Sequence, residues 1–170
     1  NELFINNGNG TFSEKARDYN LDNDGYSTHA AFFDYDGDGD LDCYILNNSF
    51  RDPARIELYR KVREQASPGG HKLMRNDGNT FTDVTTAAGI YSSEIAFGLG
   101  VAVSDLNGDN RPDLYISNDF WERDYLYLNN GDGTFSEDLT SRVNYVSTSS
   151  MGADIADINN DGHPEIFTTD

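Results

Sequence analysis

The sequence predicts an all-β protein and, within that class, part of a β-propeller. Two short motifs alternate along the chain, and each occurs three times. Both motifs are rich in turn residues and lie between apolar runs of strand length, which is typical of β-hairpins. No heptad and no i, i+3, i+4 stripe covers them, so a helical repeat has no support. Short strands that recur at a fixed spacing indicate propeller blades, because each blade is a four-stranded antiparallel sheet.

The first motif is acidic and follows the pattern D-x-[DN]-x-D-[GN]-x-x-[DE]. It occurs as DYDGDGDLD at residues 34–42, as DLNGDNRPD at 105–113 and as DINNDGHPE at 157–165. We expect short strands on either side of each acidic loop, such as 30–33 and 43–46 around the first. The unbroken apolar character of these flanks predicts strands that are buried on both faces.

The second motif predicts a tight hairpin. It reads LFINNGNGTFSE at residues 3–14, LMRNDGNTFTD at 73–83 and LYLNNGDGTFSE at 126–137. Its Asn-Gly and Asp-Gly pairs adopt the positive φ that a tight turn requires, and Thr-Phe begins the return strand. From the Phe of this motif to the first Asp of the next acidic loop, the chain runs from 12 to 34, from 81 to 105 and from 135 to 157. The two motifs therefore keep a common phase.

Four strands per repeat divide the chain into two whole and two half blades. The half blades cover 2–15 and 151–169, and the whole blades cover 29–85, with an insertion at 49–70, and 99–139. Three blades' worth of strands is too few for a closed ring of ordinary size. We therefore expect residues 1–170 to be a fragment of a single propeller domain. Either further sequence or associating copies would complete the ring, and we favour further sequence.

The composition excludes several classes of partner. The formal net charge is −18 and the pI is near 4.2, which argues against nucleic acid and against an anionic membrane surface. The hydrophobic content of 36% is enough for a core, so the acidity does not indicate disorder. A single cysteine excludes an intrachain disulfide, and no apolar run is long enough to insert into a bilayer.

The acidic loops predict calcium sites. An EF-hand shares the opening D-x-D-x-D-G, but it needs a bidentate carboxylate at position twelve and flanking helices. Position twelve here holds Ile45, Ile116 and Thr168, so the EF-hand is rejected. A compact loop between two strands can direct oxygens from positions one, three, five and nine to one point, and the carbonyl of position seven adds another. Oxygen ligands in this number favour calcium over zinc or copper, whereas magnesium demands tighter octahedral geometry.

The expected ligands are five in each loop. They are Asp34, Asp36, Asp38, Asp40 and Asp42; Asp105, Asn107, Asp109, Arg111 and Asp113; and Asp157, Asn159, Asp161, His163 and Glu165, with Asp40, Arg111 and His163 acting through their carbonyls. Gly39, Asn110 and Gly162 stand where the loop needs positive φ. We expect two to three calcium ions per chain. The alternative is that the loops are Asx-rich surface turns without metal.

Taken together, the two motifs resemble the FG-GAP/VCBS repeat family of calcium-loop β-propellers, as in integrin α-subunit heads. The resemblance is carried by FDYDGDGDLDCYILN, VSDLNGDNRPDLYISND, ADINNDGHPEIF and NNGDGTF, and it covers the chain except residues 49–70. Within the family, the chain is most similar to bacterial relatives of cartilage acidic protein. The resemblance implies calcium at positions one, three, five and nine, a secreted, cell-surface or periplasmic location, and a role in binding or adhesion.

The insertion and one short connection are the candidate partner-binding segments. The insertion holds five of the twelve basic residues, and a short helix is expected after Pro53. In the related propellers these connections lie on the face opposite the calcium loops. The candidate residues are Arg55, Tyr59, Arg60, Phe120 and Trp121. The competing interpretation is that the insertion covers neighbouring blades and that its arginines pair with surrounding acids.

Catalysis finds little support in the sequence. The three histidines, His29, His71 and His163, lie in different segments, and Cys43 is expected to be a core thiol. We expect a non-enzymatic, calcium-stabilised module that binds a protein or a glycan. Two alternatives stay open: a propeller enzyme with a lyase or hydrolase site across the central channel, and a purely structural subunit of a larger surface complex.

Overall fold

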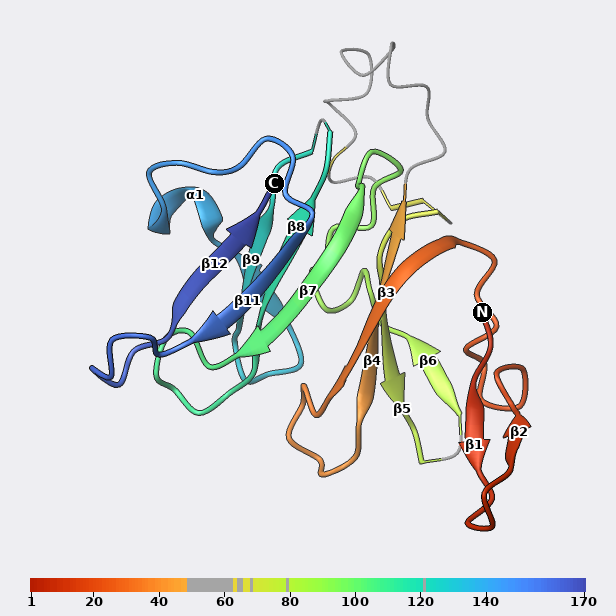
Figure 1. Ribbon diagram of the computed structural model, residues 1–170. Helices are drawn as coiled ribbons and strands as arrows, with labels where there is room; N and C mark the ends of the chain where they lie inside the picture. The colour runs from red at the N-terminus through yellow and green to blue at the C-terminus, as the bar shows by residue number, and fades with distance from the viewer. Residues whose placement is uncertain (49–62, 64–65, 68, 79, 121) are drawn as a thin grey trace.

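The computed structural model describes residues 1–48, 63, 66–67, 69–78, 80–120 and 122–170. Within these residues the chain forms four separate antiparallel sheets that follow one another along the sequence (Figure 1). The sheets are β1 (Phe4–Asn6) with β2 (Phe12–Glu14); β3 (Tyr26–Phe33), β4 (Asp42–Asn48), β5 (Lys72–Asn76) and β6 (Phe81–Asp83); β7 (Gly98–Ser104), β8 (Asp113–Asn118), β9 (Tyr125–Asn129) and β10 (Phe135–Glu137); and β11 (Gly152–Ala156) with β12 (Glu165–Thr169).

The all-β propeller class is confirmed. Both four-stranded sheets have their strands in sequence order, as a propeller blade does, and the only helix in the described residues is the single turn α1 (Leu139–Arg142). The first strands β3, β7 and β11 are neighbours and lie side by side in Figure 1, so the sheets fan out from these strands. The described residues do not form a closed ring. None of their helices is long and apolar enough to cross a membrane.

The hairpin motif folds in the same register each time. The motif's Phe pairs with its first Asn in all three copies: Phe12 with Asn6, Phe81 with Asn76, and Phe135 with Asn129. The turn glycines of the first and third copies, including Gly8 and Gly131, have the expected positive φ. The prediction of three tight hairpins is therefore confirmed.

The acidic loops join the first two strands of each sheet. The residue at position nine begins the second strand and pairs with the residue just before position one: Asp42 with Phe33, Asp113 with Ser104, and Glu165 with Ala156. Position nine thus belongs to the sheet as well as to the loop. This arrangement fixes both ends of every loop.

The prediction that the strands beside the acidic loops are buried on both faces is right for β4 and β8, in which nearly every residue is buried. It is wrong for β12, which has no buried residue, and for β3, in which only Phe33 is buried and Ala30 and Phe32 are exposed. β4 and β8 have a strand on each side within their sheets. β3 and β7 are both edge strands, but β7 contacts the first strands β3 and β11 and has no exposed residue, whereas β3 contacts only β7 of the other two first strands.

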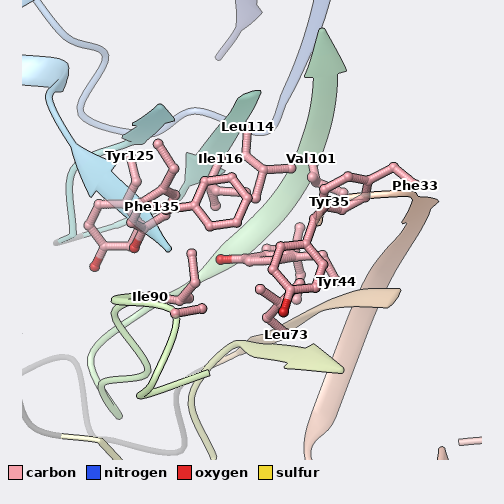
Figure 2. Close-up of a cluster of buried hydrophobic side chains, with 13 residues drawn as sticks. Phe33, Tyr35, Tyr44, Leu73, Ile90, Val101, Leu114, Ile116, Tyr125 and Phe135 are labelled. Carbon is pink, nitrogen blue, oxygen red and sulfur yellow. The ribbon is translucent and has the colours of Figure 1, made fainter. Parts of the chain in front are cut away.

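The main hydrophobic core lies between the two four-stranded sheets (Figure 2). Leu73 and Tyr44 come from one sheet, and Leu114, Ile116 and Tyr125 from the other, and all five are essentially inaccessible to solvent. Figure 2 shows these side chains facing one another across the space between the sheets. Burial of large aromatic and aliphatic side chains at this contact is the main favourable contribution to holding the two blades together.

Glycine allows the first strands to approach closely. A Cβ on Gly100 of β7 would lie 2.9 Å from the Cα of Gly152 in β11, which is closer than two packed atoms allow. A Cβ on Gly152 would instead meet only Thr169 Oγ1 at 3.4 Å. The side chain at position 100 must therefore be absent for the two sheets to keep their spacing.

This contrast gives a matched pair of substitutions. Gly100→Ala should lower the free energy of unfolding by roughly 1–3 kcal/mol, because backbone must move to admit the methyl group. Gly152→Ala should change it by less than about 1 kcal/mol in either direction, because its Cβ has space and alanine reduces the entropy of the unfolded chain. Urea unfolding of both variants measures the difference. Equal losses for the two variants would contradict the close approach.

His71 is a neutral histidine buried in this core. Its Nδ1 accepts a hydrogen bond from the backbone N–H of Asn47 at 3.1 Å, and its ring lies between Tyr44 and Tyr125. Burial lowers the pKa of His71 to about 4, because the charged form would lose its hydration. No local sequence pattern distinguishes this histidine from the other two.

The pKa of His71 predicts acid destabilisation. The unfolded chain takes up a proton on this residue near pH 6.5 and the folded protein only near pH 4, so stability is complete above pH 6.5 and falls between these values. The loss assigned to His71 should reach about 3 kcal/mol at pH 4. Urea unfolding from pH 7 to 4 should show a shallower pH dependence for His71→Gln than for the wild type. Parallel curves would contradict the assignment.

Candidate metal centre

The three acidic loops share one hydrogen-bonding scheme. The carboxylate at position one accepts the backbone N–H of position six: Gly39 to Asp34 at 3.0 Å, Asn110 to Asp105 at 2.8 Å and Gly162 to Asp157 at 2.9 Å. Position six has positive φ in each loop, at 95° for Gly39, 64° for Asn110 and 86° for Gly162, as the sequence predicts. The backbone of each loop therefore turns around the carboxylate at position one.

Position four has the same left-handed conformation, although only position six was predicted to have it. Gly37 and Gly108 have φ values of 79°, and Asn160 has 60°. The signal was present in the sequence, because Gly and Asn are the residues that tolerate this region best. Two left-handed residues in each loop bring the backbone back on itself within nine residues.

The carboxylate at position nine ties the loop to the sheet. One of its oxygens accepts the N–H of position two: Tyr35 to Asp42 at 3.0 Å, Leu106 to Asp113 at 2.9 Å and Ile158 to Glu165 at 2.9 Å. In the two whole blades its other oxygen accepts an N–H from the third strand, from Asn76 to Asp42 and from Asn129 to Asp113, both at 2.8 Å. These bonds join two strands and the loop through a single side chain.

The loop at 34–42 brings carboxylates together. One oxygen from each of Asp34, Asp36 and Asp42 lies within 4.8 Å of the others, and this is the one such group of three His, Cys, Asp or Glu ligands in the described part of the chain. Oδ1 of Asp40 is inaccessible to solvent and has no hydrogen-bond partner. The sequence predicts that Asp40 binds the cation through its backbone carbonyl alone. In the structure its side chain also has a buried oxygen in this loop.

The electrostatics of this loop are unfavourable without a cation. Burial, followed by the charges of Asp38, Asp36 and Asp34, raises the pKa of Asp40. Burial raises the pKa of Asp42 to about 6, although the N–H groups of Asn76 and Tyr35 oppose the shift. Converging carboxylates and an oxygen without a donor fit a hard divalent cation such as calcium, which takes six to eight oxygen ligands.

The loop at 105–113 balances its charge internally. The guanidinium of Arg111 lies 2.5 Å from Oδ2 of Asp109, and Nδ2 of Asn107 donates to the same oxygen at 2.8 Å. Four backbone N–H groups, that of Asn110 foremost, lower the pKa of Asp105 against the opposing effect of burial. The sequence named Arg111 for its carbonyl alone, and the structure shows that its side chain acts as a counter-ion to an expected ligand. This loop fits calcium less well than the first.

The loop at 157–165 lies between the other two loops in how well it fits a cation. Asp161 accepts the N–H of His163 at 2.9 Å, and Nδ2 of Asn159 donates to Oε1 of Glu165 at 2.6 Å. In the other loops, too, the backbone N–H of position seven donates to the carboxylate of position five: Asp40 to Asp38, and Arg111 to Asp109. No arginine enters this loop, so a cation would meet less competition here than at 105–113.

The candidate partner-binding residues are only partly described. Arg55, Tyr59, Arg60 and Trp121, together with the helix expected after Pro53, lie outside the described residues. Phe120 is exposed, has a φ of 61°, and contacts the ring of Phe97 edge-on at a centroid distance of 4.7 Å. Positive φ is uncommon for a bulky residue and tends to persist at functional positions.

One arginine of the insertion is described, and it pairs with an acid. Nε of Arg63 lies 2.6 Å from Oε1 of the buried Glu122, which belongs to the short connection of the next blade. This contact agrees with the interpretation that the insertion covers a neighbouring blade. The pKa of Arg63 is raised by Glu122, whose hydrogen bond and charge outweigh the effect of burial.

The residues considered for catalysis do not form a site. Cys43 is buried, and burial raises the pKa of its thiol to about 12, so it is an inert core thiol as expected. His71 belongs to the core, and His29 and His163 are exposed on separate segments. Of these four residues, His29 and Cys43 line one pocket in the described part of the chain, and His71 and His163 are not among its lining residues.

The hydrogen bonds to the carboxylate at position nine predict a loss of stability that does not depend on a metal. Asp42→Ala removes the acceptor for two backbone N–H groups, those of Tyr35 and Asn76. Unpaired buried donors should cost about 2–4 kcal/mol of unfolding free energy even in the presence of chelator. Asp42→Asn keeps one acceptor oxygen and should lose less. Chemical unfolding in chelator measures both, and an unchanged stability of Asp42→Ala would contradict the scheme.

Comparison with known proteins agrees with this geometry. The model of the family described as FG-GAP-like repeat matches residues 1–45 and 105–168, which is more than half of the chain. The chain therefore belongs to the FG-GAP-like repeat family, whose repeats form β-propellers and are typically non-catalytic. A search of curated proteins gave no match. The matched residues include all three acidic loops.

Proposed function

We propose that the chain is a calcium-stabilised propeller module that acts outside the cell, at the cell surface or in the periplasm, and binds a protein or a glycan. The observation that carries the proposal is the convergence of Asp34, Asp36 and Asp42, in a loop where Asp40 also has a buried oxygen without a hydrogen-bond partner. Calcium at this loop would neutralise carboxylates that otherwise repel one another. A kinship with the bacterial relatives of cartilage acidic protein is part of the same proposal.

We expect the three acidic loops to differ in their affinity for calcium. The loop at 34–42 has five aspartates and no Lys or Arg, so it should bind first. The loop at 157–165 should follow, and the loop at 105–113 should bind last because Arg111 must leave Asp109. Affinities in the range of about 10⁻⁴ to 10⁻³ M suit calcium loops that work outside the cell. Two to three ions per chain would bind at millimolar calcium.

The face opposite the acidic loops is the proposed recognition surface. Each four-stranded sheet has its loop at one end of the first two strands, and the connection between its second and third strands lies at the other end. Phe120 stands in such a connection and is exposed. An exposed aromatic ring near charged side chains suits contact with a protein or a sugar ring. Calcium would act at a distance from this surface by fixing the geometry of the blades.

Thermal unfolding with calcium and with chelator tests the proposal. A site filled at about a hundred times its dissociation constant adds about 2.7 kcal/mol of stability. In a chain of this size, that corresponds to a rise in Tm of roughly 5–10 °C per site. Asp36→Ala should lose the contribution of the first site in calcium while keeping the wild-type Tm in chelator, because Asp36 is exposed and serves only the ion.

The control is Asp22→Ala, which removes an exposed carboxylate outside the loops and leaves the overall charge change the same. Its response to calcium should equal that of the wild type. Asn107→Ala and Asn159→Ala report on the other two loops through the difference in Tm between calcium and chelator, because each also removes hydrogen bonds that do not involve a metal. A wild-type Tm that does not respond to calcium, or an equal loss in Asp22→Ala, would contradict the proposal.

A further inference from the structure

The acidic loop at 34–42 is held by two blades. Its position-two residue, Tyr35, is buried, and the backbone N–H of Tyr35 donates to Asp42 of the same blade at 3.0 Å. The backbone carbonyl of Tyr35 accepts a hydrogen bond from Nδ2 of Asn129 at 2.7 Å, and Asn129 is the last residue of β9 in the next blade. A residue between two expected calcium ligands is therefore fixed by its own sheet and by the neighbouring sheet.

The side chain of Tyr35 makes a second contact with that neighbouring sheet. Its ring stacks on Phe135 of β10, with the ring centroids 6.0 Å apart and the ring planes 26° from parallel (Figure 2). Both rings are buried in the main core between the two four-stranded sheets. Stacked aromatic pairs contribute more than the burial of their area alone. The position of Tyr35, and with it the path of the loop, therefore depends on how the two sheets pack.

A cleft of about 480 Å³ lies between the loop and the next blade. Asp36, Asp38 and Arg75 line it from the first blade, and the hairpin turn at 131–134 lines it from the second. That turn contributes the exposed carboxylate of Asp132. Two expected calcium ligands and a carboxylate of the next blade therefore border the same space.

Charges of both signs border this cleft. The hydroxyl of Thr134 donates to Oδ1 of Asp132 at 2.6 Å, which lowers the pKa of Asp132 and keeps its carboxylate ionised. On the first blade, Nε of Arg75 donates to Asp77 at 2.9 Å, and this bond, together with the weaker effect of the Asp36 charge, raises the pKa of Arg75. A divalent cation at the cleft is attracted by the carboxylate and repelled by the guanidinium.

We propose that the calcium site at 34–42 is shared between two blades, so that the ion stabilises their contact as well as the loop. Asn129 and Phe135 of the second blade hold Tyr35 in place. Asp132 adds negative charge across the cleft. This inference rests on the proposed function of the loop as a calcium site. By thermodynamic linkage, a change that loosens the contact between the blades must then weaken calcium binding at this loop.

A matched pair of core substitutions tests the sharing. Phe135 and Phe81 hold the same position in the hairpin motif, and each is 5% exposed. Phe135 belongs to the second blade and stacks on Tyr35, whereas Phe81 belongs to the same blade as the loop and contacts Phe32 edge-on. Phe135→Leu should raise the calcium dissociation constant of the loop at least about fivefold, and Phe81→Leu should leave it unchanged. A site confined to the first blade would respond to Phe81→Leu at least as strongly.

Calcium titration followed by NMR resolves the three loops in the intact chain. The position-six amides of Gly39, Asn110 and Gly162 each donate to the first carboxylate of their own loop, so each amide reports on its own site. The loop at 157–165 is the internal control, and its calcium dissociation constant should be the same in every variant.

Two charge variants test the cleft without changing the core. Asp132→Asn should weaken calcium binding at the Gly39 amide by about threefold to tenfold, and Arg75→Gln should strengthen it by a similar factor. Asp22→Asn removes one negative charge at an exposed position outside the cleft and should have no effect. If Phe135→Leu does not fold, these charge variants decide the question.

The outcomes separate this inference from the proposed function. If the Gly39 amide of the wild type does not respond to calcium, both are wrong. If it responds, but with the same dissociation constant in Phe135→Leu as in Phe81→Leu, the loop binds calcium within one blade. The sharing is then overturned, whereas the proposed function stands. An equal response of Asp132→Asn and Asp22→Asn would overturn the sharing in the same way.

Discussion

One buried carboxylate in each whole blade holds this architecture together. Asp42 and Asp113 each accept an N–H from their own loop and an N–H from the third strand of their sheet. Each is inaccessible to solvent, and the energetic cost of burying its charge is offset by these charge-assisted hydrogen bonds. The loop, the second strand and the third strand therefore meet at a single side chain. This contact thus joins the acidic loop to the hairpin motif that follows it, although the two are 34 residues apart in one blade and 16 in the other.

The same carboxylate links the fold to the proposed metal site. In the loop at 34–42 it lies among four other aspartates, and the charges that remain unpaired call for a cation. In the loop at 105–113 the side chain of Arg111 supplies positive charge from within the chain. Sites built on one backbone scheme can thus differ in their need for calcium. The difference comes from the residues at positions three and seven, and the curl of the loop is unchanged.

Much of the fold could be predicted from the sequence because its signals are local. Asn-Gly turns define the hairpins, and Gly39, Asn110 and Gly162 mark left-handed positions. The exposure of β3 could not be predicted, since it depends on which neighbouring sheets pack against this strand. The contacts of Asp42 with Asn76 and of Arg63 with Glu122 join residues far apart in the sequence, so no local pattern predicts them. The candidate ligands were predictable, but their unequal surroundings were not.

Amide hydrogen exchange measured by NMR tests the central role of position nine most directly. In calcium-free buffer the N–H groups of Tyr35, Asn76, Leu106 and Asn129 should exchange far more slowly than those of the exposed loop glycines Gly37 and Gly108. Such protection would show that the carboxylates organise loop and sheet without a metal. Exchange of the four amides as fast as that of the two glycines would contradict the account, because the loops would then be held by something other than position nine.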